Sequence, residues 1–165
     1  MSDLSRFLPL SQRRGRDDAD VSVDRRAQVS QVVRAALRHL AGEDVRAAFV
    51  RDAGLADAGP LDEGTAGRIA AGPPLRLTDL VRVVRAVLVH VADPVELPAP
   101  VMGAVALAAS ASAPFARRAA ISGHTVRAAD AEWSIGRGPE LVASSRQIVA
   151  FLLGLSDEAP RRPAN

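Results

Sequence analysis

The chain has 165 residues and a mass of 17.3 kDa, the size of one ordinary domain or of two small lobes that share a core. It has no cysteine, which excludes disulfides, a thiol nucleophile of its own and any cysteine-ligated metal. All 21 basic residues are arginine and 19 residues are acidic, so the net charge of +2 does not by itself indicate a nucleic-acid partner.

The N-terminal segment, residues 1–24, mixes arginines with aspartates and is polar. Such a mixed-charge run is typical of a solvated tail, and we predict a flexible arm here. The segment is too polar for a signal peptide, and the longest apolar stretch, 101–109, has about half the length of a membrane span. We therefore expect a cytoplasmic protein without membrane contacts.

The first half of the chain carries helical periodicity. Apolar residues such as Val29, Val33 and Leu40 recur at the spacing of one helix face and predict a helix over about 26–41. Four further helices are predicted, and glycine or proline residues mark where they begin and end. Their ranges are 43–53, 65–71, 77–91 and 99–112.

The second half changes pattern. Short alternating runs predict strands at 125–129, 132–135 and 140–143, with a hairpin turn at 136–139. A last helix over 146–153 and a polar tail over 157–165 follow. The predicted fold class is therefore α+β: a helical part over 25–95, then a part over 96–156 with a small antiparallel sheet and packed helices.

Three motifs in the second half carry a family resemblance. They are RAAD at 127–130, EWS at 132–134 and GRGPEL at 136–141. In this order and spacing they resemble the C-terminal domain of the mycothiol-dependent maleylpyruvate isomerase family. The resemblance implies that a reduced, DinB-like helical bundle precedes this domain and that the protein acts on a small unsaturated acid with mycothiol, a low-molecular-weight thiol, as cofactor.

Two upstream segments resemble the family's metal-ligand helices, VVRAALRHLAG at 32–42 and VLVHVAD at 87–93. The resemblance implies a divalent metal, most simply zinc, held by His39 and His90. From the residues, Asp93 is a candidate third ligand, and Glu43 and Asp44 are alternatives. Such a metal would polarise the thiol so that the thiolate adds to an activated double bond. Ala86 stands where the family has a ligand Glu, and Leu155 where it has an Arg, so inactivity is an equal expectation.

The pair Arg117 and Arg118 is a candidate cofactor-binding site, because guanidinium groups match a carboxylate or an anionic thiol conjugate. The alternative, which we favour from the residues alone, is a solvated pair at the entrance of a strand.

Two other function classes remain open. Thr65 and Arg68 lie in a run that resembles the recognition helix of small helix-turn-helix regulators, which predicts contacts to a DNA major groove. The alanine-rich helix over 99–112 is compatible with a non-catalytic assembly module, and a homodimer is one form that it could take.

Overall fold

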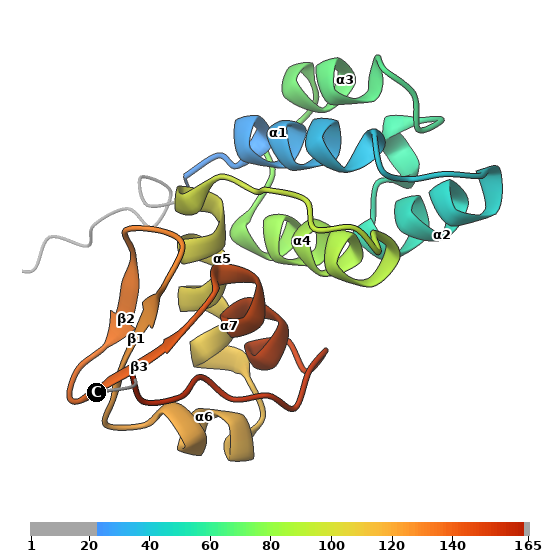
Figure 1. Cartoon of the computed structure of the whole chain (residues 1–165). Helices are drawn as coiled ribbons and strands as arrows, with labels where there is room; N and C mark the ends of the chain where they lie inside the picture. The colour runs from blue at the N-terminus through green and yellow to red at the C-terminus, as the bar shows by residue number, and fades with distance from the viewer. Residues whose placement is uncertain (1–22, 164–165) are drawn as a thin grey trace, which may run out of the picture.

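The computed structural model describes residues 23–163, which form a helical half followed by a mixed half (Figure 1). In the helical half, α3 lies along α1 on the side away from α4, so that the helices stack in layers. The elements of this half are α1 (Arg26–Leu37), α2 (Glu43–Ala53), the 3-10 helix η4 (Ala56–Ala58), α3 (Thr65–Ala71) and α4 (Leu77–His90).

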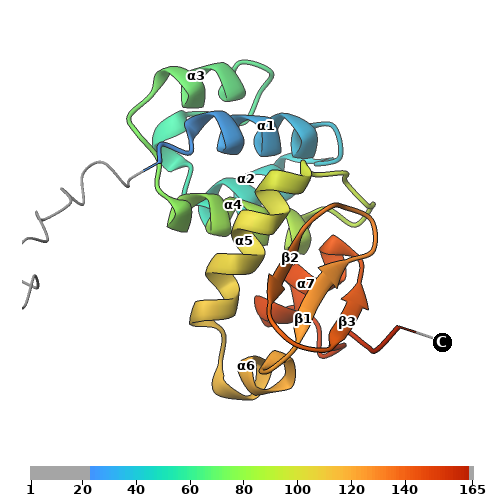
Figure 2. The ribbon, with the colours of Figure 1, turned by 90° about the vertical axis from the view of Figure 1, so that its left-hand side faces the viewer.

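The second half packs a small sheet against helices, and α5 runs from the helical half down to α6 (Figure 2). Its elements are α5 (Ala99–Ser112), α6 (Phe115–Ile121), β1 (Thr125–Ala128), β2 (Ser134–Gly136), β3 (Glu140–Ala143) and α7 (Ser145–Leu152). The predicted α+β class, with its helical N-terminal half, is confirmed. The predicted helices at 43–53, 65–71 and 99–112 have the observed bounds, whereas α6 was not predicted.

The sheet has the strand order β2-β1-β3 and is mixed. Val126 of β1 is opposite Ile135 in an antiparallel pair and opposite Leu141 in a parallel pair. The prediction of an antiparallel sheet was therefore wrong for β3. The segment 136–139 is not a hairpin between neighbours, because it carries the chain across the start of β1 to the far side of that strand.

Two glycines make this crossing loop possible. Gly136 and Gly138 have φ of 83° and 124°, a region that residues with a Cβ rarely adopt. A Cβ at Gly136 would also overlap the carbonyl oxygen of His124, and one at Gly138 would overlap that of Gly123. Thr125 then fastens the loop, since its backbone N–H donates to the carbonyl of Pro139 at 3.0 Å.

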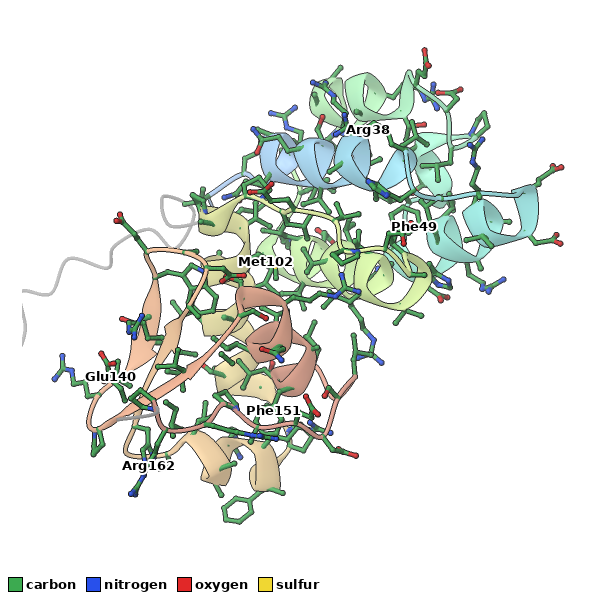
Figure 3. The ribbon with its side chains drawn as sticks, in the orientation of Figure 1. Arg38, Phe49, Met102, Glu140, Phe151 and Arg162 are labelled. Carbon is green, nitrogen blue, oxygen red and sulfur yellow. The ribbon has the colours of Figure 1, made fainter. Side chains whose placement is uncertain are left out.

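One continuous apolar core extends through both halves. Met102 of α5 lies at their junction, and Phe49 and Phe151 are buried on either side of it (Figure 3). The core is built mainly from valine, leucine, isoleucine and alanine, since the chain has few aromatic residues. The two halves are therefore held together by burial of apolar surface and not by a flexible linker alone.

The C-terminal segment 156–163, which we call the strap, lies along the outer edge of β3. The backbone N–H of Val142 donates to the carbonyl of Arg161 at 2.6 Å, and Arg161 donates back at 3.2 Å. We expected a polar tail over 157–165, yet Arg161 within it pairs with β3; residues 164–165 lie outside the described part of the chain. At the other end, Asp24 was assigned to a flexible arm, yet its carboxylate accepts from the backbone N–H groups of Arg26 and Leu75. The rest of the predicted arm, 1–22, lies outside the described residues.

Within residues 23–163, no individual helix combines the length and apolar character that a membrane crossing requires. Together α5 and α6 have enough of both, but the pair is bent by 118°.

Candidate functional site

The two predicted histidine ligands have different surroundings. His90, at the end of α4, has its Nε2 at 2.7 Å from Oδ2 of Asp52 in α2. This hydrogen bond lowers the pKa of Asp52 below its ordinary value of 3.8, and the nearby Arg51 guanidinium adds to the effect. The imidazole of His90 thus joins α2 to α4.

His39 instead lines a groove of about 560 Å³ beside the C-terminal end of α1, where Arg38 also lies (Figure 3). We call it the linker groove, because the segment that joins the two halves forms its other wall. Its lining residues are Ala35, Arg38, His39 and 94–99. Arg38, His39 and Glu96 are exposed, and no other described residue donates a hydrogen bond to their side chains or accepts one from them.

The predicted metal ligands do not form one group. Within residues 23–163, no three His, Cys, Asp or Glu side chains lie close enough to hold an ion. The predicted set of His39, His90 and Asp93 is therefore not assembled: His90 is bonded to Asp52, and Asp93 is not among the residues that line the groove of His39. Because a catalytic zinc normally has three protein ligands, the described donor set does not fit that metal.

Glu96 and Arg38 are polar residues of the groove that the sequence did not single out as candidates. Glu96 lies in a proline-flanked loop outside any helix and has no ligand-like spacing to a histidine. Glu96 also lines a second hollow of about 350 Å³, whose other wall includes Asp130, Ser145 and Arg146. The loop that carries Glu96 therefore separates two adjacent hollows at the junction of the halves.

Arg117, a predicted cofactor ligand, is engaged within the fold. Its Nη1 donates to the carbonyl of Phe151 at 2.8 Å and to that of Ser156, and its Nη2 lies 2.8 Å from Oδ1 of Asp157. The guanidinium also lies 5.1 Å from the centre of the Phe151 ring. Arg117 therefore fixes the strap and is not free to bind a ligand. Arg118 is exposed and has no polar partner among the described residues.

Two residues of the three motifs, Asp130 and Trp133, form a hydrogen-bonded cluster with Ser145 at the start of α7, which we call the lock. Asp130 accepts hydrogen bonds from the backbone N–H and the hydroxyl of Ser145, at 2.8 and 2.7 Å, and Trp133 donates its Nε1–H to the same hydroxyl at 3.1 Å. Burial raises the pKa of Asp130, but the hydrogen bonds that the carboxylate accepts, two of them from Ser145 and one from its own backbone, together outweigh burial, and the pKa lies below its ordinary value. The carboxylate thus stays ionised and anchors the helix N-terminus.

The residues proposed for DNA contact are also engaged. Thr65 is only 1% exposed, and its hydroxyl donates to the carbonyl of Pro60. Arg68 donates to the carbonyl of Ala58 and forms an ion pair with Asp62 at 3.0 Å. The burial of Thr65 leaves it unable to reach a base, whereas Arg68 is exposed and is held by contacts within the fold, so the arrangement does not favour the helix-turn-helix alternative.

Comparison of the chain with models of protein families, with curated proteins and with solved structures found no match.

Proposed function

We propose that the chain is a maleylpyruvate isomerase-like protein, which binds a small unsaturated acid in the linker groove and uses a low-molecular-weight thiol, such as mycothiol, as co-reactant. The observation that carries the proposal is that Arg38 and His39 line one open groove and that neither is engaged by the described fold. The groove also lies where two halves of a chain meet, a common position for small-molecule sites.

Arg38 is the residue that would hold the acid. A guanidinium presents two parallel N–H donors, which match the two oxygens of a carboxylate. Glu96 would face the same ligand with a negative charge, so it would disfavour an acid placed in the wrong orientation. The groove therefore supports an asymmetric ligand, with its carboxylate toward Arg38.

His39 is the residue that would move the proton. A ring nitrogen of the imidazole can accept the proton of a bound thiol. The thiolate then adds to one carbon of the double bond, and the electron pair of that bond moves onto the conjugated carbonyl. The former double bond is now a single carbon–carbon bond, and the molecule rotates about it. When the electron pair returns from the carbonyl, the carbon–sulfur bond breaks, the thiolate leaves, and the double bond re-forms as the other isomer. His39 then returns the proton to the thiol.

The thiol has to come from outside, since the chain has no cysteine. No step of this route passes through a metal, because the described donor set does not fit one.

The test uses the full chain with maleate as ligand, in the presence and absence of mycothiol. Isothermal titration should detect binding, and proton NMR should detect conversion of maleate to fumarate only when the thiol is present. Arg38→Gln should weaken binding by about 10- to 150-fold, the loss of one charge-assisted hydrogen-bonded pair. His39→Gln should abolish conversion with a smaller effect on binding.

Arg34→Gln is the matched control, since Arg34 is exposed on the same helix one turn earlier and does not line the groove. The proposal fails if the wild type neither binds nor converts the acid, or if Arg34→Gln and Arg38→Gln bind equally well.

A further inference from the structure

The second hollow, beside the lock, is lined by both halves of the chain. Its volume of about 350 Å³ is within the range of small-molecule sites. The helical half contributes Leu88 of α4, and the other half contributes Met102 of α5, which lies at the junction of the halves (Figure 3), together with Asp130 and Ser145 of the lock. Residues 95–97, which join the halves, also line it. A ligand held here would therefore contact both halves at once.

Much of the wall of the second hollow is apolar. Four of its apolar side chains pack against the core but are only half-buried, so part of their surface stays exposed: Leu88, Val95, Leu97 and Ala131. Covering such surface removes it from water, which is favourable in proportion to the area. The wall therefore favours a ligand that has an aliphatic group.

Three charged side chains line the same hollow, and none of them is neutralised by the fold. They are the carboxylates of Glu96 and Asp130 and the guanidinium of Arg146. None of the three forms an ion pair with another described residue. Arg146 is half-buried, and its one described side-chain hydrogen bond is a long contact of 3.4 Å from Nη2 to the carbonyl of Val91. Unpaired charges of both signs around one hollow are costly to the fold alone, and they are typical of a binding site.

Asp130 keeps one carboxylate oxygen for a ligand. Its Oδ1 accepts both hydrogen bonds from Ser145, and no other described residue donates to Oδ2. Because the hydrogen bonds in the lock hold the pKa of Asp130 below its ordinary value, this oxygen belongs to an ionised group at neutral pH.

We propose that the second hollow binds a free α-amino acid with an aliphatic side chain. The carboxylate of the ligand would pair with Arg146, whose guanidinium matches its two oxygens, and the ammonium group would pair with Asp130 and Glu96. The aliphatic side chain would lie against the apolar wall. A simple acid would leave the two carboxylates of the hollow unpaired, and a simple amine would leave Arg146 unpaired. A ligand that carries both charges pairs all three groups.

The proposal does not rest on the linker groove, because it needs neither Arg38 nor His39. Glu96 is the charged residue that the two hollows share, whereas Arg146 lines the second hollow alone and Arg38 lines the linker groove alone. Arg146→Gln should leave maleate binding within about twofold of the wild type, and Arg38→Gln should leave amino-acid binding within the same limit. Failure of one site is therefore distinguishable from failure of the other.

The first test compares four ligands on the full chain by isothermal titration, and it needs no variant. L-leucine should bind. Isoamylamine, which is leucine without its carboxylate, and isocaproate, which is leucine without its ammonium group, should each bind about 10- to 150-fold more weakly, because each loses one charge-assisted contact. Glycine, which lacks the aliphatic side chain, should bind at least about tenfold more weakly.

The second test locates the ligand. Arg146→Gln and Glu96→Gln should each weaken the binding of leucine by about 10- to 150-fold. Arg85→Gln is the matched control for Arg146, because Arg85 also donates to one backbone carbonyl, that of Leu153 at 2.7 Å, and does not line the hollow. Thermal melts followed by circular dichroism show whether each variant is folded.

Three results would overturn the proposal. The first is that leucine does not bind the wild type at concentrations up to about 10 mM. The second is that isoamylamine or isocaproate binds as tightly as leucine, which would show that one charge is enough. The third is that Arg85→Gln and Arg146→Gln bind leucine equally well.

Discussion

Arg117 and Asp157 are joined by an ion pair of 2.8 Å, which ties the strap to α6. The same guanidinium donates to two backbone carbonyls, those of Phe151 and Ser156. The side chain of Asp157 is fully exposed, whereas that of Arg117 is only 17% exposed. The stabilising part of this cluster is therefore the pair of carbonyl contacts and not the ion pair.

Arg117→Gln should lower the free energy of unfolding by about 2 kcal/mol, because two carbonyls lose a charged donor. Urea denaturation followed by circular dichroism measures this change. Arg118→Gln is the control and should be nearly neutral, since Arg118 is exposed. Asp157→Asn should also be nearly neutral, and a loss as large as that of Arg117→Gln would contradict our assignment.

The crossing loop gives the sharpest stability prediction. Gly138→Ala should prevent folding or greatly destabilise the chain, because its Cβ would overlap the carbonyl oxygen of Gly123, a backbone atom that cannot move aside cheaply. Gly67→Ala is the matched control. Gly67 is exposed inside α3 with open space around it, so its replacement should stabilise the chain by about 0.5–1 kcal/mol. Thermal melts of the two variants measure the contrast, and equal melting temperatures would be incompatible with the crossing loop.

The hydrogen bonds of Asp130 in the lock predict that the free energy of unfolding falls at acidic pH. The pKa of this carboxyl is lower in the folded chain than its ordinary value of 3.8, so the folded state favours the ionised form. The contribution to stability is present above the ordinary value and is lost as the pH falls through the lower, folded-state pKa.

Asp130→Asn should therefore destabilise the chain at neutral pH and reduce the further loss of stability in acid. Unfolding free energies measured across the acid range check this expectation. Asp93→Asn, at an exposed position without a described hydrogen-bond partner, is the control. An unchanged acid profile in Asp130→Asn would show that the lock contributes nothing.

Replacing His39 and replacing His90 should have different effects on the binding and conversion of maleate. His90 is held by Asp52, and His39 lines the linker groove. His90→Gln should leave maleate affinity within about twofold of the wild type, because independent sites act additively. His39→Gln should abolish thiol-dependent conversion. If both variants lose conversion to the same extent, the two imidazoles act in one site and our separation of them is wrong.

The long helices could be predicted from the sequence because each has a buried stripe at regular spacing. α6 could not, since it has seven residues, most of them exposed, and therefore no such stripe. Its position depends on Arg117 reaching the carbonyls of Phe151 and Ser156, contacts between residues far apart in the sequence. Local periodicity contains no information of that kind.

For a similar reason, the local sequence could not show on which side of β1 the strand β3 pairs. A Gly-Arg-Gly-Pro segment is as compatible with a hairpin as with a crossing, and only the close approach to Gly123 and His124 distinguishes the two. The candidate site was predicted in part: His39 was identified as a candidate ligand, while Arg38, Glu96 and Asp52 were not. A carboxylate in a loop, or one paired across two helices, has no spacing that reveals its partner.

The strap also determines whether another strand can pair with the β3 edge of the sheet. Arg161 is opposite Val142, and antiparallel pairing would place Pro163 opposite Glu140. Proline has no backbone N–H to donate, so the next hydrogen-bonded pair after Arg161 and Val142 cannot be completed and the ladder has a single bridge. The β3 edge of the sheet, closed in this way, is a poor template for the addition of a further strand on that side.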